Sequence, residues 1–334
     1  MSKKNKINLY IGINTNHHLK GGGFNFLDFL SYRLSKKKII SKSVVDANII
    51  LINSHHNFLK ILFYKFFFPK KVFIHRIDGP ISKYVGKEDF RDYLVEVLNK
   101  YVADASIFQS NWSYNKNKFK TTKEKIIIHN MADQRFYKYK KEKKIKNSII
   151  ICSWSNNINK GYKYYSFIDK NLDFKKFHIS FVGNSPIEFK NIKNYNFLNS
   201  NQLSKLMRKH MIYLTASKND PCSNSLLEAL NLRLPALTLK SGGHPEILKK
   251  KGICFENKND LLIKINYIFN NYKKILNKFN NPIEDRVNEY LDYFNVILEK
   301  SNQKKLICKK IKVFTLLQIL FLYLSKKIQL IYKN

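Results

Sequence analysis

Two carboxylates frame the stretch of this chain whose residue types and spacing point most directly to chemistry. In "NDPCSNSLLEAL", Asp220 and Glu228 stand on either side of a short polar loop and the start of a helical pattern. Three small polar residues lie between them: Ser223, Asn224 and Ser225. Ser223 or Asn224 can cap the helix, whose first N–H groups then face outward and can bind a phosphate. The carboxylates can accept hydrogen bonds from sugar hydroxyls, so the stretch suits a ligand that carries both sugar and phosphate.

A run of three glycines near the N-terminus could bind the same kind of anion. Gly21, Gly22 and Gly23 follow the apolar run "INLYIGI" and precede the helical pattern "FNFLDFLSYRLSKK". Glycine lets backbone N–H groups approach a phosphate closely. The spacing fits neither G-x-G-x-x-G nor the P-loop, which argues against nicotinamide enzymes and P-loop NTPases. A flexible turn is the alternative interpretation.

Short apolar runs alternate with helical patterns and predict the elements that carry these residues. The runs lie at 7–13, 47–53, 71–77, 105–110 and 125–130, and again at 148–154, 176–183, 211–217 and 234–239. Such alternation indicates βα units and parallel sheets covered on both faces. Ligands of open parallel sheets bind at the carboxyl ends of the strands, so we expect the site in a cleft between two lobes.

The length of 334 residues also favours two domains. The lysine-rich stretch "YKYKKEKKIKN" separates the two sets of strands, which predicts one α/β domain over 1–140 and another over 141–282. Residues 283–303 form a helical pattern that could cross back to the first domain, and 304–334 form a basic amphipathic tail. Four widely spaced cysteines, without metal-ligand spacing, indicate reduced thiols in a cytoplasmic protein.

The stretch "NDPCSNSLLEALNLRLPALTLKSGGHPEIL" resembles the donor-binding signature of retaining GT-B glycosyltransferases of the family 4 type. "IFQSNWSYNKNKF", "IHNMADQRFY" and "NKGYKYY" are similar to further segments of that family in order and spacing. The resemblance spans about residues 7–300. It implies a GT-B fold, with two Rossmann-like domains facing across a cleft and C-terminal helices.

The resemblance also implies roles for individual residues. Glu228 would contact the ribose of a nucleotide-sugar, and Asp220 would contact hydroxyls of the transferred sugar. The backbone around Ser223, Asn224 and Ser225, together with Lys160, would hold the diphosphate, and Gly21 to Gly23 would close over it. Two positions depart from the family pattern: Asp220 stands where a glutamate is usual, and Ser155 stands where the family has an arginine.

The strand "FIHRIDGP" supplies the remaining catalytic candidates. Its end corresponds to the place where related enzymes hold a polar group near the reacting carbon, which points to Asp78 with His75 beside it. A packed strand residue is the alternative for His75, and a plain turn is the alternative for Asp78 followed by Gly79. Because the chain has no D-x-D, we expect a metal-independent site without a cofactor.

The net charge of +37 raises the question of an anionic partner. Nucleic acid is one alternative, but no motif for it is visible and we expect none to bind. A compositional bias of the genome explains the charge equally well. The tail and "NFLKILFYKFFFPKK" combine lysines with apolar residues, which predicts peripheral contact with the inner face of the plasma membrane. The alternative is a tail helix packed on the first domain.

No apolar run reaches the length of a spanning helix, and the nearest one, 313–325, ends at Ser325. The resulting hypothesis is a retaining glycosyltransferase with a nucleotide-sugar donor and a saccharide or lipid-linked acceptor. It would act in the synthesis of cell-surface polysaccharide, lipopolysaccharide or glycolipid. A catalytically weak GT-B scaffold and a basic nucleic-acid-binding protein are the alternatives.

Overall fold

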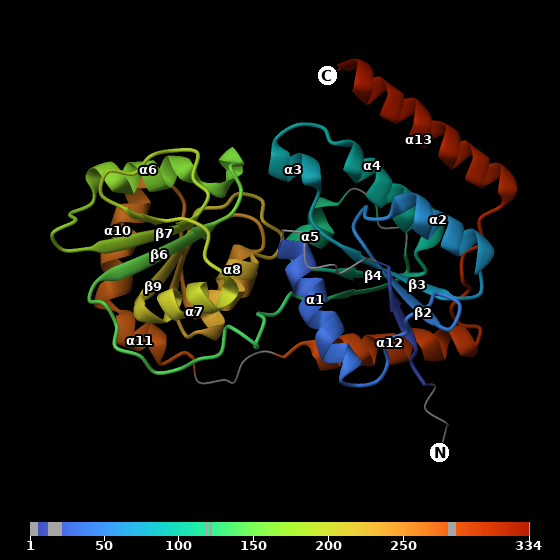
Figure 1. Cartoon of the computed structure of the whole chain (residues 1–334), viewed down its shortest axis with the longest axis horizontal. Helices are drawn as coiled ribbons and strands as arrows, with labels where there is room; N and C mark the ends of the chain where they lie inside the picture. The colour runs from blue at the N-terminus through green and yellow to red at the C-terminus, as the bar shows by residue number, and fades with distance from the viewer. Residues whose placement is uncertain (1–5, 13–21, 118, 120–121, 280–284, 334) are drawn as a thin grey trace. The chain divides into compact units, whose positions relative to one another are not determined.

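The computed structural model describes residues 6–12, 22–117, 119, 122–279 and 285–333. The chain divides into two compact units. The first comprises Met1–Lys83, Lys87–Ile128 and Arg286–Asn334, and the second comprises Tyr84–Gly86 and His129–Asp285. Each unit is built on one parallel sheet with helices packed against it (Figure 1). The predicted α/β architecture with two Rossmann-like domains is confirmed.

The first unit has a five-stranded sheet in the order β1-β2-β3-β4-β5, with every neighbouring pair parallel. Its strands are β1 (Leu9–Ile11), β2 (Ile49–Asn53), β3 (Val72–Ile77), β4 (Ala105–Phe108) and β5 (Glu124–Ile127). Every residue of β2, β3 and β4 is buried, as the continuous apolar runs predict for strands covered on both faces.

The helices associated with this sheet come from both ends of the chain. They are α1 (Gly22–Ser35), α2 (Phe58–Phe67), α3 (Ile81–Val85), α4 (Phe90–Val97) with the π-helix η1 (Leu98–Val102), α5 (Asn111–Lys116), α12 (Val287–Asn302) and α13 (Val313–Lys333). The hydroxyl of Tyr293 in α12 donates to the carbonyl of Ser106 in β4, at 3.1 Å. The C-terminal segment 286–333 is therefore part of the first unit.

The second unit has a six-stranded parallel sheet in the order β11-β10-β9-β6-β7-β8. Its strands are β6 (Ser148–Ser153), β7 (His178–Gly183), β8 (Lys193–Tyr195), β9 (Ile212–Thr215), β10 (Ala236–Leu239) and β11 (Gly252–Phe255). Its helices are η2 (Ile158–Lys160), α6 (Tyr162–Asn171), α7 (Ser200–Lys209), α8 (Asn224–Asn231), α9 (His244–Leu248), α10 (Lys258–Asn270) and α11 (Tyr272–Leu276).

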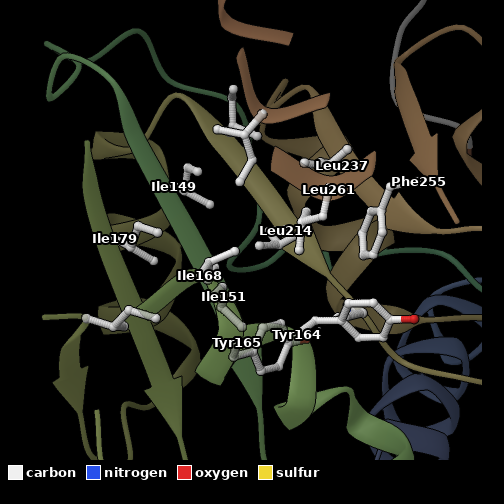
Figure 2. Close-up of a cluster of buried hydrophobic side chains, with 14 of the residues drawn as sticks. Ile149, Ile151, Tyr164, Tyr165, Ile168, Ile179, Leu214, Leu237, Phe255 and Leu261 are labelled. Carbon is white, nitrogen blue, oxygen red and sulfur yellow. Dashed lines mark hydrogen bonds between the residues drawn. The ribbon is translucent and has the colours of Figure 1, made fainter. Parts of the chain in front are cut away.

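Alternate residues of the central strand β6 pack into two separate hydrophobic cores, one on each face of the sheet. Ile149 and Ile151 pack in one buried cluster with residues of α6 and α10, which Figure 2 shows. Ile150 and Cys152 pack in a second cluster with residues of α7 and α8. This division follows from the two-residue period of a strand, and it buries both faces of the sheet.

The chain passes from the first unit to the second between Ile128 and His129 and returns to the first between Asp285 and Arg286, whereas the sequence analysis divided the domains at 140/141 and 282/283. Tyr137, which is only 3% exposed, packs in the second unit's core. The short strands β8 and β11 are additional to those predicted.

The apolar C-terminal run is longer than the sequence analysis allowed. Helix α13 continues beyond Ser325 to Lys333, and its window Val313–Leu330 has a mean hydropathy of 1.3. Among the described residues, it is the one helix long and apolar enough to cross a membrane by length and composition. Only 11% of this window is buried, which distinguishes it from a core helix.

Candidate functional site

The start of α8 is the centre of the candidate site, and its geometry follows from a cap. Ser223 has extended backbone angles, and its Oγ accepts a hydrogen bond from the Leu226 N–H at 3.4 Å. Of the two capping residues considered from sequence, the structure thus uses Ser223. The remaining N–H groups of the first turn carry the partial positive charge of a helix N-terminus, which favours an anion.

The polar triplet is held in place by side chains from elsewhere in the second unit. The Tyr213 hydroxyl in β9 donates to Ser225 Oγ at 2.7 Å. The Asn224 Oδ1 accepts from Asn130 Nδ2, also at 2.7 Å. Ser223 Oγ and Ser225 Oγ lie 3.3 Å apart. The helix start is therefore preorganised by β9 and by the segment that enters the second unit.

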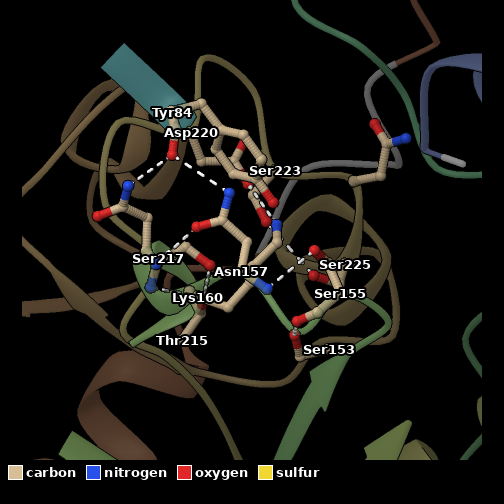
Figure 3. Close-up of polar contacts among 12 residues, drawn as sticks. Tyr84, Ser153, Ser155, Asn157, Lys160, Thr215, Ser217, Asp220, Ser223 and Ser225 are labelled. Carbon is tan, nitrogen blue, oxygen red and sulfur yellow. Dashed lines mark hydrogen bonds and ion pairs between the residues drawn. The ribbon is translucent and has the colours of Figure 1, made fainter. Parts of the chain in front are cut away.

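A lysine and an aspartate are paired in the same region. Lys160 Nζ lies 3.5 Å from Asp220 Oδ2, with the two side chains 21% and 15% exposed. Figure 3 shows this pair among the polar side chains around Ser223 and Ser225. Burial alone would lower the pKa of Lys160, but the Asp220 carboxylate and the Tyr84 hydroxyl outweigh it and raise the pKa. The ammonium group is thus positively charged in the folded protein.

Tyr84 adds a second layer of contacts to Lys160. The Lys160 ammonium lies 5.3 Å from the centre of the Tyr84 ring. The Tyr84 carbonyl accepts hydrogen bonds from the side-chain amides of Asn157, at 3.3 Å, and Asn159 (Figure 3). Ser155 accepts a hydrogen bond from the Asn157 N–H through its Oγ at 3.2 Å.

Two glycines allow the loops around the pair to approach closely. Gly161 has a φ of +89°, and a Cβ there would lie 2.4 Å from the Ala216 carbonyl oxygen. Gly242 has a φ of +63°, and a Cβ there would lie 2.2 Å from the Asp220 carbonyl oxygen. The Gly243 N–H donates to that same oxygen at 2.9 Å. The Gly-Gly loop therefore fixes the backbone that carries Asp220.

Glu228 has partners that the sequence analysis did not identify. It is half-buried in α8 and forms a side-chain hydrogen bond with Tyr137. Burial and the nearby Asp133 carboxylate raise the pKa of Glu228 to about 8, although the hydrogen bond with Tyr137 opposes the rise. Tyr137 ends the segment "IHNMADQRFY", for which the sequence analysis assigned no residue roles, and a tyrosine beside a phenylalanine carries no distinct sequence signal.

The candidates of the first unit lie in different surroundings. Gly22 and Gly23 begin α1, and a Cβ on Gly23 would meet nothing within 4 Å, whereas Gly21 lies outside the described residues. Asp78 follows β3, and its carboxylate is 29% exposed and 3.4 Å from the Arg76 guanidinium. The Ser113 hydroxyl donates to the Asp78 carbonyl at 3.0 Å.

His75 is fully buried in β3, with Nε2 2.9 Å from the Ser54 carbonyl oxygen. Burial lowers the pKa of His75 to about 4, so the ring is neutral. This geometry corresponds to the packed strand residue that was the alternative interpretation. We therefore assign His75 no role in the reaction proposed below, because a side chain without exposed surface has no access to a substrate.

One protein family matches the second unit. Residues 188–284 match the model of the family described as Glycosyl transferases group 1. This segment contains Asp220, the polar triplet and Glu228. A search of curated proteins finds no match.

Solved structures match nearly the whole chain. HepE from Anabaena in complex with UDP is 12% identical, with a TM-score of 0.63, covering 96% of this chain and 100% of its own. A glycosyltransferase from Rickettsia africae is 13% identical, with a TM-score of 0.64 over 88% of this chain and 99% of its own. TarM is 15% identical, with a TM-score of 0.56 over 81% of this chain, which spans 58% of the TarM chain.

The chain has the GT-B fold. The GT-B fold accounts for the two parallel-sheet units described above. It also places the loop before α8 at the carboxyl end of β9, the end of the strands at which open parallel sheets bind ligands. Among the described residues, no group of three or more His, Cys, Asp or Glu is arranged to hold a metal ion.

Proposed function

We propose that the chain is a retaining glycosyltransferase that transfers a sugar from a nucleoside diphosphate sugar to an acceptor hydroxyl. The observation that carries the proposal is the Lys160–Asp220 pair beside the Ser223-capped start of α8. A cation and a helix N-terminus together favour the charge that develops on a leaving diphosphate. The family match over residues 188–284 supports the assignment.

In the proposed reaction, the acceptor oxygen forms a bond to the anomeric carbon while the bond from that carbon to the diphosphate oxygen breaks. The acceptor attacks on the face from which the diphosphate leaves, so the sugar keeps its anomeric configuration. A phosphate oxygen of the departing diphosphate takes the hydroxyl proton. Lys160 and the N–H groups around Ser223, Asn224 and Ser225 stabilise the diphosphate, and no metal or further cofactor takes part.

We assign the remaining contacts by chemistry. Glu228 binds the ribose hydroxyls, and Asp220 binds hydroxyls of the transferred sugar while paired with Lys160. Gly21, Gly22 and Gly23 contribute backbone N–H groups, and Asp78 supplies the polar group of the first unit near the reacting carbon. The acceptor is a saccharide or lipid-linked saccharide of the cell envelope, reached from the cytoplasmic side of the membrane.

Donor binding tests this proposal directly. Thermal-shift and calorimetric titrations with UDP, GDP, ADP and their sugars should identify one nucleotide that raises the melting temperature, because binding to the folded state stabilises it. Lys160→Met should weaken binding of that nucleotide about tenfold or more, through the loss of a charge-assisted hydrogen bond. Lys163→Met, at an exposed position nearby in the chain, is the matched control and should bind normally.

Ser155 favours a second candidate, a GT-B scaffold with weak catalysis. The hydroxyl at this position supplies no charge to a diphosphate, so Lys160 would have to act without an arginine beside it. A nucleotide that binds tightly, with no sugar released or transferred in the presence of acceptor extracts, would favour the scaffold. Turnover that is abolished in Lys160→Met and retained in Lys163→Met would favour the enzyme.

A further inference from the structure

Helix α13 carries two apolar faces, and only one of them is packed. Leu316 and Ile319 are buried in the cluster formed with α2 and α4, and Tyr323 stacks on Phe58 of α2 with ring centres 5.3 Å apart. The spacing i, i+3, i+7 places these three side chains on one stripe of the helix. They hold α13 along the first unit, beside α2 and α4 (Figure 1).

The second apolar stripe is exposed. Its members are Phe314, Leu317, Phe321, Leu324 and Ile328, and their exposed fractions lie between 52% and 70%. The spacing of three and four residues keeps these side chains on one face along most of the helix. A soluble surface rarely exposes a continuous row of five large apolar side chains, so this face marks a site of interaction.

Helix α2, which contacts α13 through Phe58, adds to the exposed apolar surface. Leu59, Phe63 and Phe67 on α2 are 37%, 39% and 67% exposed. Lysines accompany both helices, and the chain has no Asp or Glu from residue 301 to its end. A surface that combines exposed aromatics with uncompensated positive charge matches the boundary between lipid headgroups and acyl chains.

We propose that the exposed stripe of α13 docks the protein on an anionic lipid surface, with Phe314 and Phe321 inserted at the headgroup boundary.

The positive charge of α13 argues against a second copy of this chain as the partner, because two α13 helices would bring lysines together without any acidic residue to pair with them. The packed stripe decides against a spanning helix, because crossing the bilayer would remove Leu316 and Ile319 from the core of the first unit. The proposal does not depend on the reaction proposed for the second unit.

Vesicle flotation of the full-length chain tests the proposal. Wild-type protein should float with vesicles of phosphatidylcholine and phosphatidylglycerol, bind vesicles of phosphatidylcholine alone much less, and dissociate as salt is raised. The double variant Phe314→Ser/Phe321→Ser should lose on the order of tenfold in partitioning, because two large apolar side chains no longer insert. Ile263→Ser, at a 65% exposed position of α10, is the matched control and should bind as wild type does.

Point substitutions are preferable to removal of the tail. A truncation at Lys304 would also remove Leu316, Ile319 and the hydrogen bond from the Lys309 N–H to Asp104 Oδ1, so lost binding could reflect an opened core. The altered phenylalanines are exposed, and circular dichroism should show an unchanged fold.

Three results would overturn the proposal. The first is equal flotation of the double variant and the wild type, or no flotation of the wild type on either vesicle. The second is a wild-type dimer in light scattering that becomes a monomer in the double variant, which would identify a second copy as the occupant. The third is wild-type protein that stays with the vesicles through high salt and alkaline carbonate, which would indicate a spanning helix.

Discussion

The pKa of the Glu228 side chain is set by the residues that surround it in the folded protein. Its hydrogen-bond partner Tyr137 and the carboxylate of Asp133 lie in the segment that enters the second unit. The side chains of Cys152 in β6 and Tyr213 in β9 also interact electrostatically with Glu228. The raised pKa means that the protonated acid is the favoured form of the folded protein near neutral pH.

This shift makes the stability of the protein depend on pH. Between an unfolded pKa near 4.5 and the folded pKa of about 8, the unfolded chain loses the Glu228 proton while the folded chain keeps it, so stability falls as pH rises. The free energy of unfolding should fall by on the order of a few kcal/mol across this range. Glu228→Gln should remove this part of the fall, as urea unfolding at pH 5, 7 and 9 can measure. Parallel curves for the variant and the wild type would contradict the assignment.

The hydroxyl of Tyr137 should also affect the pKa of Glu228. Because its hydrogen bond lowers the pKa of Glu228, Tyr137→Phe should raise that pKa further. Under the proposed function, the ionised carboxylate accepts hydrogen bonds from the ribose, so a higher pKa leaves a smaller ionised fraction and ribose binding should weaken about threefold to tenfold near pH 7. Calorimetric titration of the nucleotide from pH 6 to pH 9 should show the binding profile displaced to higher pH. A uniform loss of affinity at every pH would indicate a packing defect instead.

At the scale of elements, the site is formed by loops that leave the strands and by the helices that follow them. The loop after β10 reaches the backbone of Asp220 through Gly242 and Gly243, and the turn before α6 reaches Ala216 through Gly161. These contacts leave no room for a side chain. The glycines therefore hold in place the loops around the Lys160–Asp220 pair.

Substitution of Gly242 should test whether its close approach to the Asp220 backbone contributes to stability. Gly242→Ala should cost about 1–3 kcal/mol of stability, because the new Cβ collides with the Asp220 carbonyl and the backbone has a positive φ. Gly23→Ala is the control, since a Cβ there meets nothing within 4 Å within a helix, and it should be neutral or stabilise by about 0.5–1 kcal/mol. Thermal unfolding measures both; equal effects would show that the Gly242 contact is unimportant.

At the scale of the whole molecule, the C-terminal segment completes the first unit. Asp104, just before β4, is fully buried at its carboxylate and accepts hydrogen bonds from Lys65 Nζ at 2.7 Å, the Phe73 N–H at 2.8 Å and the Lys309 N–H at 2.7 Å. One carboxylate thus joins α2, β3 and the segment before α13. An ion pair between Lys300 Nζ and Glu124 Oε2, 2.6 Å apart, connects α12 with β5.

Loss of the Asp104 charge should destabilise the first unit. Asp104→Asn leaves the buried Lys65 ammonium without its counter-ion, which should cost about 3–5 kcal/mol. The exposed Lys240–Glu256 pair of the second unit is the control, and Glu256→Gln should leave the free energy of unfolding unchanged within experimental error, because solvent screens the pair. Urea unfolding followed by tryptophan fluorescence measures both variants. A loss below about 1 kcal/mol in Asp104→Asn would contradict this account.

Element prediction succeeded where burial is continuous and failed where it is not. The strands β2, β3 and β6 are buried along their whole length, and an apolar run in the sequence is sufficient to locate them. The edge strand β8 is exposed or half-exposed, so its residues carry no apolar pattern. Helix α13 extends past Lys326 and Lys327 because lysines on an exposed face do not interrupt a helix.

The sequence by itself determined the features that depend on neighbouring residues. The alternation of strands and helices, the two parallel sheets and a cap of α8 at Ser223 or Asn224 all follow from local pattern and composition, since hydrophobic period and capping act over a few residues. Tertiary structure alone decided which polar side chains became partners. Burial of His75, the pairing of Glu228 with Tyr137 and the attachment of the C-terminal segment through Asp104 required segments distant in the chain to pack together, because desolvation and hydrogen bonding depend on what surrounds a group in space.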